Sequence, residues 1–495
     1  MLKKIRIALA AVFFTGLTLL FLDFTGTLHH WLGFMAKVQA LEAVLALNVV
    51  VIVGLAVLTL VFGRIYCSVI CPLGVLQDIF ALWGRKAKKN RYSFSPEKKW
   101  LRYLVLVVFI AALLGGVVSS LAQLLAPYSA FGRIATMLLQ PVWKVGNNIL
   151  ASFAESVDSY AFYTVDVWLK SMPVLIIAIL TVIILFVLAW RGGRTYCNTI
   201  CPVGTALSLL ARFSWLKVRF DSDKCRNCSL CSKNCKAACI DYTNHRVDYS
   251  RCVVCGDCLQ SCKFGALKYG AGSANRQNGP TSADSPADPT RRSFLLATAM
   301  ATTAAMAEEA KKVDGGLAPI EAKQQPERLT PLTPPGSLSA KNMAQHCTGC
   351  LLCVSECPNQ VLRPSTDLMH LMQPVMSYER GYCRPECTRC SDVCPAGAIR
   401  PLDEIEKSSI QIGHAVFLQK NCVAVSDGVE CGNCARHCPA EAIEMVPLDE
   451  DDNLSPSIPA INESHCIGCG ACEYICPARP FSAIIVEGHE VHKTI

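Results

Sequence analysis

Six short runs of four cysteines set the strongest limit on the structure of this 495-residue chain. Within most runs two or three residues separate successive cysteines, and in the last four runs a proline follows the fourth cysteine. This spacing is typical of bacterial ferredoxins, in which cysteine thiolates hold [4Fe–4S] clusters. Zinc also binds Cys-x2-Cys pairs, but so many complete runs of four favour iron–sulfur clusters. The runs use 24 of the 29 cysteines, which argues against a disulfide scaffold.

The first two runs predict a cytoplasmic two-cluster ferredoxin domain over residues 216–270. In such domains three cysteines of one run and the fourth cysteine of the other run hold each cluster. Cys239 is a surplus thiol that could replace Cys235, and Lys236 and Lys263 stand where a proline usually follows the run. The expected ligand sets are Cys225, Cys228, Cys231 and Cys262 for one cluster, and Cys252, Cys255, Cys258 and Cys235 for the other.

Four further runs predict a four-cluster ferredoxin domain over residues 346–495. Apolar pieces at 398–399, 442–443 and 483–485 follow three of these runs and are expected to form short strands of an α+β ferredoxin-like fold. The runs can exchange their fourth cysteines sequentially, or in a nested order in which the first run pairs with the fourth. The expected ligands are Cys347, Cys350, Cys353, Cys357, Cys383, Cys387, Cys390, Cys394, Cys422, Cys431, Cys434, Cys438, Cys466, Cys469, Cys472 and Cys476.

Residues 1–215 have the pattern of an α-helical membrane domain. Only 17% of the chain is charged, below the ~25% usual for soluble domains. Basic residues gather before the first apolar segment, between the second and third, and after the fourth. The positive-inside rule therefore predicts that both ends of this domain lie in the cytoplasm. The four predicted transmembrane helices are Ile7–Leu28, Ala43–Gly63, Tyr103–Ala126 and Met172–Trp190.

The membrane domain contains an internal repeat. The string Gly-Arg-Ile-Tyr-Cys-Ser-Val-Ile-Cys-Pro-Leu-Gly at 63–74 matches Gly-Arg-Thr-Tyr-Cys-Asn-Thr-Ile-Cys-Pro-Val-Gly at 193–204. Two hairpins of the same orientation imply a parallel repeat, so Cys67, Cys71, Cys197 and Cys201 are expected to converge at the cytoplasmic face. A packing role at a helix start is the alternative. Because the whole string is repeated, a redox or metal role is favoured.

Histidines are scarce in the membrane domain. His29 and His30 are the two in the first 200 residues, and they do not provide the axial pair that a transmembrane haem requires. With Asp23 they could handle the protons of a quinol, although interfacial histidines are more often simply solvated.

Residues 271–345 are expected to form a flexible linker, because the region begins with a stretch rich in Ser, Ala, Pro, Gly and Asp. Within it, 290–307 combines an Arg-Arg pair, a mildly apolar stretch and an Ala-Met-Ala ending. This segment resembles a twin-arginine export signal, which would carry the four-cluster domain to the periplasm with or without cleavage. A degenerate signal would leave that domain in the cytoplasm.

Residues 1–270 resemble the NapH/MauN family, with four spans, two Cys-x3-Cys-Pro motifs and a two-cluster ferredoxin tail. The chain from Thr290 onward resembles the NapG/MauM family, with a twin-arginine leader and four cluster runs. The sequence is therefore similar to a fusion of two quinol-dehydrogenase electron-transfer proteins. The resemblance implies that electrons pass from the membrane quinol pool to a periplasmic cytochrome or reductase acceptor, as in nitrate respiration.

Six [4Fe–4S] clusters in one chain favour a one-electron relay, with a further centre at the Cys-x3-Cys-Pro cysteines as an added expectation. The sequence has no convincing nucleophile, acid–base pair or nucleotide loop, so no catalytic residue is predicted and the chain is expected to be an electron-transfer component. A nucleic-acid partner is not expected, because the basic clusters flank apolar spans. An electron-supplying maturation factor, or a redox-sensing membrane assembly protein, are the other function classes.

Overall fold

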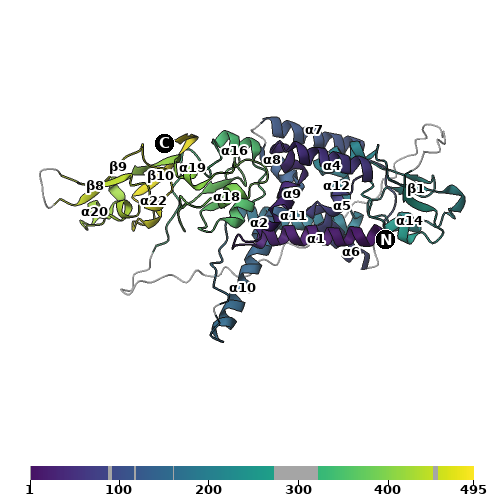
Figure 1. Ribbon diagram of the computed structural model, residues 1–495, viewed down its shortest axis with the longest axis horizontal. Helices are drawn as coiled ribbons and strands as arrows, with labels where there is room; N and C mark the ends of the chain where they lie inside the picture. Colours follow the sequence, from purple (N-terminus) through teal and green to yellow (C-terminus); the bar gives the residue numbers. More distant parts are fainter. Residues whose placement is uncertain (1, 87–91, 116–118, 160, 272–320, 450–454) are drawn as a thin grey trace, which may run out of the picture.

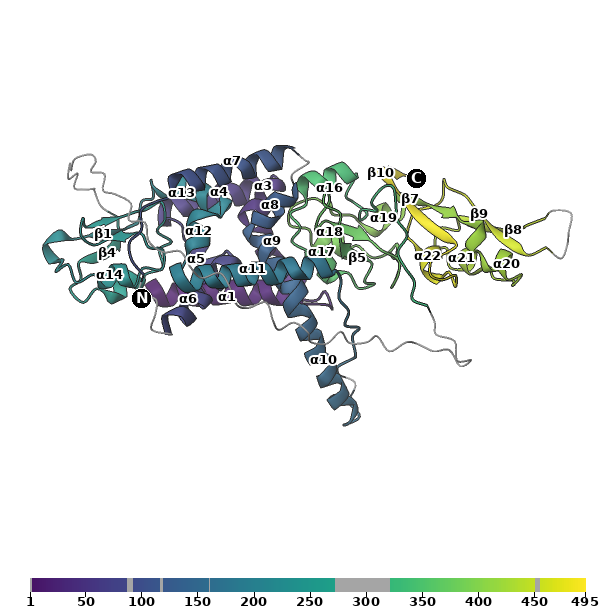
Figure 2. The same cartoon turned by 180° about the vertical axis from the view of Figure 1, so that it is seen from behind.

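The computed structural model describes residues 2–86, 92–115, 119–159, 161–271, 321–449 and 455–495. A helical bundle lies between two smaller parts that consist of short helices and strands (Figure 1). The N-terminus and residues 217–270 lie at one end of the bundle, and residues 321–495 lie at the other end, as the view from behind also shows (Figure 2). Ala271, the last described residue before the gap, therefore lies at one end of the bundle. Glu321, the first described residue after it, lies at the opposite end.

The bundle contains two helices that are long and apolar enough to cross a membrane, α1 and α11. The other two predicted spans correspond to the 14-residue α4 and to α7 and α8, which adjoin residues outside the described region. The elements of the bundle are α1 (Leu2–Leu22), α2 (His29–Lys37), α3 (Ala40–Leu45), α4 (Val49–Phe62), α5 (Tyr66–Val69), α6 (Pro72–Lys86), α7 (Lys99–Gly115), α8 (Ser119–Leu125), α9 (Pro127–Ile134), a π-helical turn (Ala135–Leu139), α10 (Gln140–Glu155), α11 (Met172–Gly192), α12 (Thr195–Thr199) and α13 (Pro202–Ala211).

Two of the predicted spans have bounds that differ from the expected ones because polar side chains end or start the helices. The carboxylate of Asp23 accepts hydrogen bonds from the backbone N–H groups of Thr25, Gly26 and Leu28, so α1 ends at Leu22. The predicted span over 43–63 is divided between α3 and α4. Asn48 caps α4 by accepting a hydrogen bond from the backbone N–H of Val51.

The loop expected after the third predicted span is largely helical. Every residue of α9 is buried, and α9 continues through the π-helical turn into α10. α10 projects sideways from the bundle at a steep angle to α1 and α11 (Figures 1 and 2). Large apolar side chains on α10, including Val142, Ile149 and Phe153, are each about two-thirds exposed or more. Hydropathy along the sequence missed α9 and α10 because their polar residues interrupt the apolar run.

The two end parts consist of short helices and five antiparallel two-stranded sheets among the described residues. Strand pairs are β1–β4, β2–β3, β5–β6, β7–β10 and β8–β9. The elements at the N-terminal end are β1 (Lys217–Phe220), α14 (Leu230–Lys233), β2 (Ile240–Asp241), β3 (Arg246–Val247), α15 (Asp257–Ser261) and β4 (Leu267–Gly270). Those at the other end are α16 (Ala340–His346), α17 (Leu352–Glu356), β5 (Leu362–Pro364), β6 (Pro374–Met376), α18 (Arg389–Asp392), α19 (Glu404–Ser408), β7 (Ile410–Phe417), α20 (Val423–Ser426), α21 (Asn433–Arg436), β8 (Ile443–Pro447), β9 (Ser457–Ile461), α22 (Ala471–Ile475) and β10 (Ile484–Thr494).

One of the three expected strand positions is wrong. The pieces at 442–443 and 483–485 adjoin or enter β8 and β10, but 398–399 lies outside any strand. Ala398 and Ile399 are buried, so the apolar pattern there reflects burial in a turn. Their backbone N–H groups face the thiol of Cys394 and oppose the rise in its pKa that burial causes. A turn around the Cys394 thiol is therefore present where the sequence predicts a strand.

Candidate metal centres

The two runs at the N-terminal end form two separate groups of thiols. One pocket is lined by the first three cysteines of the first run and by the fourth cysteine of the second run, namely Cys225, Cys228, Cys231 and Cys262. A second pocket is lined by Cys235, Cys239, Cys252, Cys255 and Cys258. The chain therefore exchanges its fourth cysteines, as the spacing predicts for a two-cluster ferredoxin.

The second of these cavities contains one thiol more than a cluster needs. The sulfur atoms of Cys235 and Cys239 lie 3.5 Å apart, and both residues are buried. Cys239 also lies beside Cys252. The sequence left open which of Cys235 and Cys239 is the ligand, and both reach the cavity.

The four runs of the C-terminal part pair sequentially, the first with the second and the third with the fourth. One pocket is lined by Cys357 of the first run together with Cys383, Cys387 and Cys390 of the second. Burial raises the pKa of Cys353 well above its usual value, and its thiol neighbours, which include Cys394 of the second run, raise it further. The resulting first two groups are Cys347, Cys350, Cys353 and Cys394, and Cys357, Cys383, Cys387 and Cys390.

The third and fourth runs exchange in the same way. Burial raises the pKa of Cys472, and the nearby thiols of Cys469, Cys466 and Cys438 raise it further. The thiols of Cys431 and of Cys476, which belongs to the fourth run, raise the pKa of Cys434. Cys422 packs against the same buried side chains as Cys476. The nested alternative therefore does not describe this structure. These two groups are Cys438, Cys466, Cys469 and Cys472, and Cys422, Cys431, Cys434 and Cys476.

The group around Cys350 lies directly against the bundle. The backbone oxygen of Cys350 approaches Gly132 of α9 so closely that a Cβ atom there would lie 2.2 Å from it. Gln123 and Gln140 donate hydrogen bonds to the backbone oxygens of Cys347 and Ser355, both at 3.2 Å. Farther out, the backbone N–H of Cys383 donates to the oxygen of Cys469 at 3.0 Å, which joins the second group to the third.

The cysteines of the repeat converge inside the bundle. Cys67, Cys71, Cys197 and Cys201, which we call the cysteine quartet, are each 4% exposed. Burial raises the pKa of Cys201, and the other three thiols of the quartet raise it further. Each motif follows a long apolar helix, includes a single short helical turn and is followed by a helix that starts at its proline, so the chain turns back towards the bundle interior at both motifs. The predicted convergence is therefore present, within the bundle.

The glycines that recur in both strings allow close packing. A Cβ atom on Gly74 would lie 2.2 Å from the backbone oxygen of Cys67, and one on Gly204 would lie 2.5 Å from that of Cys197. Gly63 and Gly193 adopt positive φ angles of 79° and 66° where α4 and α11 end. The repeat therefore encodes a backbone shape as well as four thiols.

The arginines of the repeat cross between its two halves. Arg64 donates to the backbone oxygen of Cys197 at 3.1 Å, and Arg194 donates to that of Cys67 at 2.6 Å. Both arginines are 0% exposed. Gln77 of the first half donates to the sulfur of Cys197 at 3.3 Å. Two buried positive charges therefore flank the cysteine quartet, and each half holds the other in place.

A buried ionic network joins the bundle to the two-cluster part. Asp78 of α6 accepts from Arg194 at 2.7 Å, Lys236 at 2.8 Å and Arg6 at 3.1 Å. Lys236 also lies 3.4 Å from Asp257. The lysine that replaces the usual ferredoxin proline thus forms part of the interface, a role that spacing alone could not reveal.

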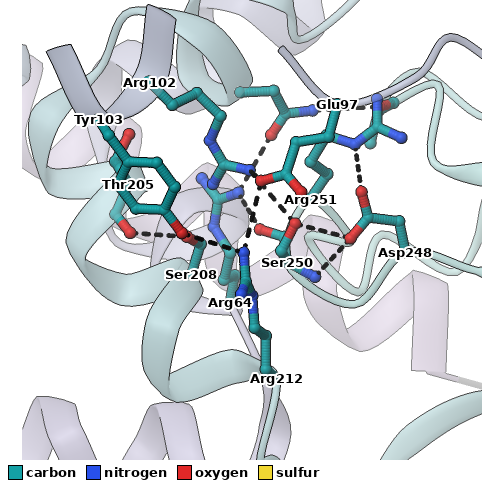
Figure 3. Close-up of polar contacts among 12 residues, drawn as sticks. Arg64, Glu97, Arg102, Tyr103, Thr205, Ser208, Arg212, Asp248, Ser250 and Arg251 are labelled. Carbon is teal, nitrogen blue, oxygen red and sulfur yellow. Dashed lines mark hydrogen bonds and ion pairs between the residues drawn. The ribbon is translucent and has the colours of Figure 1, made fainter. Parts of the chain in front are cut away.

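A second polar cluster supports the same interface (Figure 3). Arg64 donates to the backbone oxygen of Ser250 at 2.9 Å, and Arg102 donates to its hydroxyl at 3.2 Å. Asp248 accepts from the Ser250 hydroxyl at 2.6 Å and from Arg251 at 2.6 Å. The arginine that touches the quartet is therefore also bonded to the loop before Cys252.

Comparison with known proteins identifies the chain type. A model of a 4Fe-4S binding domain matches residues 44–91 and 173–221, and 4Fe-4S dicluster domains match 248–361 and 429–479. The methylamine utilization ferredoxin-type protein MauM of Methylobacillus flagellatus is 33% identical over 153 residues, which cover 30% of this chain and 64% of that protein. MauM of Methylorubrum extorquens is 31% identical over 153 residues, which cover 29% of this chain and 67% of that protein. The chain belongs to the MauM/Nap-type ferredoxins.

The ferredoxin-type protein NapF of Escherichia coli is also similar, with 28% identity over 160 residues that cover 32% of this chain and 87% of NapF. No solved structure matches the chain. The presence of ferredoxin domains that bind 4Fe-4S clusters is thereby confirmed. Both repeats of the cysteine quartet fall inside the matched 4Fe-4S binding domain.

The thiol groups suit clusters better than single ions. Within the residues that the structure describes, no three His, Cys, Asp or Glu side chains adopt a single-ion site. A [4Fe–4S] cluster has a different iron for each thiolate, so its ligands stand farther apart than those of one zinc ion. Buried, mutually close thiols around a cavity are what such a ferredoxin cluster needs.

The histidines singled out in the sequence do not join any of these groups. The carboxylate of Asp23 is used by the turn that ends α1, and His30 is exposed. His29 packs against Gly33, and burial lowers its pKa. These residues therefore form part of a helix turn at the four-cluster end of the bundle.

Proposed function

We propose that the protein is a membrane-bound polyferredoxin that carries electrons from the quinol pool to a periplasmic reductase system, such as a nitrate reductase chain. The observation that carries this proposal is the order of the cysteine groups. Two groups lie at one end of the bundle, the cysteine quartet lies inside it, and four groups follow at the other end. A line of redox centres through a helical bundle is suited to moving electrons along its long axis.

Each of the six groups would bind one [4Fe–4S] cluster through four of its thiolates, and each bound cluster takes up and releases one electron. The protein's own residues set the surroundings of these centres. Lys407 donates to the backbone oxygens of Arg384 and Cys387, which holds the loop of the second run. Backbone N–H groups at 396–399 face Cys394. Such hydrogen bonds and charges tune cluster potentials.

The cysteine quartet would bind a further centre, which would join the two sets of clusters. Four thiolates around a [4Fe–4S]2+ core carry two net negative charges. Arg64 and Arg194, both fully buried beside the quartet, supply compensating positive charge. The match of a 4Fe-4S binding domain to both repeats supports an iron–sulfur centre there.

The protein would be a multi-pass protein of the inner membrane, with α1 and α11 among its spans. Basic residues such as Lys3 and Arg64 contact the two-cluster part, so the positive-inside rule favours a cytoplasmic two-cluster domain. The apolar, exposed side of α10 at the other end has the character of a helix that lies in a membrane interface. The four-cluster domain would then be periplasmic. The twin-arginine-like segment at 290–307 lies outside the described residues.

Quinol-driven reduction tests the proposed function. In membrane vesicles kept free of oxygen, decylubiquinol or a short-chain menaquinol is expected to reduce the clusters, because the quinol pool is the proposed donor. Electron paramagnetic resonance (EPR) signals of reduced [4Fe–4S] clusters provide the measurement, with dithionite as the positive control. Clusters that respond to dithionite and to neither quinol would contradict the proposal.

The sidedness has its own test. With an epitope tag after Ile495, protease added to intact spheroplasts is expected to remove the tag, because the four-cluster domain is proposed to face the periplasm. A tag before Met1 is expected to survive until the cells are lysed. Protection of both tags in intact spheroplasts would instead put all clusters in the cytoplasm.

The similarity to MauM supports one alternative function. MauM is described as a methylamine utilization protein of ferredoxin type. A relative of it could supply electrons while another redox enzyme is assembled, without sustained turnover with quinol. The vesicle experiment separates the two, because a maturation factor would not support continuous oxidation of added quinol.

A further inference from the structure

The two thiol groups at the N-terminal end differ in their exposure to solvent. Four of the five cysteines in the pocket of Cys235 are buried, and Lys236 ties this group to the bundle. The other group, which we call the outer group, consists of Cys225, Cys228, Cys231 and Cys262. Only Cys231 of the outer group is buried, and Cys228 is the one exposed cysteine in the part of the chain that the structure describes. A cluster bound by the outer group would therefore reach the protein surface.

Basic side chains surround the outer group. Arg226, Lys233 and Lys263 are exposed, and each stands within two positions of one of its cysteines. Across residues 217–270, all of which the structure describes, ten residues are basic and five are acidic. Asp223 is the only one of the five acidic residues that is exposed. The exposed basic residues of this part are Lys224, Arg226, Lys233, Arg246, Lys263 and Lys268. The surface around the outer group is therefore positively charged.

Apolar side chains are exposed within this basic surface. Leu230 and Phe264 line the pocket of the outer group and are also exposed to solvent. The guanidinium of Arg226 lies 5.0 Å from the centre of the Phe264 ring. An apolar patch with a charged rim is the usual composition of a protein docking site. Lys236, in the place of one ferredoxin proline, binds the bundle, whereas Lys263, in the place of the other, belongs to this surface.

We propose that the outer group is a docking site for a soluble, acidic carrier of single electrons, which delivers electrons to the relay at its two-cluster end. The inference goes beyond the proposed function, in which the quinol pool is the donor. A carrier rich in carboxylates complements the basic rim, and opposite charges speed such encounters. An anionic lipid surface would also be attracted, but an exposed cluster ligand such as Cys228 favours an electron-transfer partner.

The electron count of the encounter balances without a further reactant. Flavodoxin, an acidic protein that contains FMN, is a carrier of the proposed class in its hydroquinone state. Each encounter would oxidise the FMN hydroquinone anion to the neutral semiquinone and reduce the cluster of the outer group from the 2+ to the 1+ state. One electron moves and no bond forms or breaks. No proton is transferred, because the hydroquinone anion and the neutral semiquinone carry the same protons.

Stopped-flow mixing of flavodoxin hydroquinone with the oxidised full-length protein in detergent tests the docking site. The blue semiquinone reports each electron delivered, and we expect a second-order rate constant that falls as salt is added. Lys233→Glu combined with Lys263→Glu should lower this constant about tenfold at low ionic strength, the lower end of the range for electrostatic steering. Lys341→Glu combined with Lys493→Glu makes the same change of net charge at the other end, and should react like the wild type.

Cross-linking of the wild-type protein provides a second measurement that does not depend on any variant. A carbodiimide joins carboxylates of bound flavodoxin to nearby lysines, and we expect the joined peptides to contain Lys233 or Lys263. Iron content and dithionite-reduced EPR spectra like those of the wild type establish that the variants still hold their clusters. If a variant loses iron, the salt dependence and the cross-links of the wild type decide the question.

Several results would overturn the docking site. They are a rate constant that does not depend on salt, equal slowing in both double variants, and cross-links confined to peptides that lack Lys233 and Lys263. Shielding of these lysines by phosphatidylglycerol vesicles and not by flavodoxin would make the surface a lipid contact and would equally overturn it. Quinol takes no part in this experiment. Failure of the docking site therefore leaves the proposed function standing, and failure of quinol-driven reduction in vesicles leaves the docking site standing.

Discussion

Replacement of Cys67, Cys71, Cys197 and Cys201 together by serine is expected to lower the iron content of the protein from about 28 to about 24 atoms per chain. Six clusters of four irons account for about 24, and the further centre for the remaining four. The same variant should lose electron exchange between the two-cluster and four-cluster ends. The reason is that these thiols are buried inside the bundle, between the two ends, and are flanked by Arg64 and Arg194.

Iron analysis, EPR and timed reduction from one end measure these effects. Ser68→Ala, in the same turn between the first two cysteines, is the control and should retain all the iron, because the Ser68 hydroxyl bonds only a backbone oxygen in its own turn. A loss of one iron atom in place of four would point to a single-ion centre. Unchanged iron and spectra would reject any centre at the quartet and leave these thiols with a packing role.

Asp78→Asn is expected to destabilise the protein by roughly 3–5 kcal/mol, the cost of removing one partner from a buried ion pair. Asp78 is the carboxylate shared by Arg6, Arg194 and Lys236. Although burial opposes it, Arg194 and Lys236 hold the pKa of Asp78 well below its usual range. The stabilisation is therefore present at neutral pH and is lost only as the pH falls towards that lowered pKa.

Thermal unfolding in detergent, followed through the visible absorption of the clusters, measures this loss. The signals of the two-cluster part should disappear at a lower temperature than in the wild type, since Lys236 connects that part to the bundle. Asp223→Asn removes an exposed carboxylate from the same part and should leave the transition unchanged. Equal transitions in both variants would mean that the ionic network does not hold the interface.

The spacing of cysteines predicted the local groupings well because ligand exchange is a property of short runs. At both ends, cysteines such as Cys262 and Cys357 lie with the first three cysteines of the neighbouring run. The order of pairing among the last four runs was not readable, because sequential and nested exchange use identical residues. The order of pairing depends on how the loops pack, for example on the backbone hydrogen bond from Cys383 to Cys469.

Hydropathy predicted the helix boundaries of the bundle less accurately. It does not register a break such as that at Asn48, where a side chain caps α4, nor the buried but partly polar α9. Long-range polar contacts were also invisible. Nothing in the order of residues links Asp78 to Lys236 or Gln123 to Cys347, since each contact requires the folded interface. These contacts therefore emerged only from the structure, whereas the sequence had pointed to Asp23 and the histidines.

The crossing of Arg64 and Arg194 bears on how this bundle arose. A single ancestral hairpin could have satisfied its arginine only on a second copy of itself, so gene duplication would have joined two subunits that already exchanged contacts. The two halves are no longer equivalent, because Arg194 meets Asp78 while the second half has Ser208 at the equivalent position. Both halves keep the thiols, whereas at this position the first half alone has the carboxylate that binds Lys236 of the two-cluster domain.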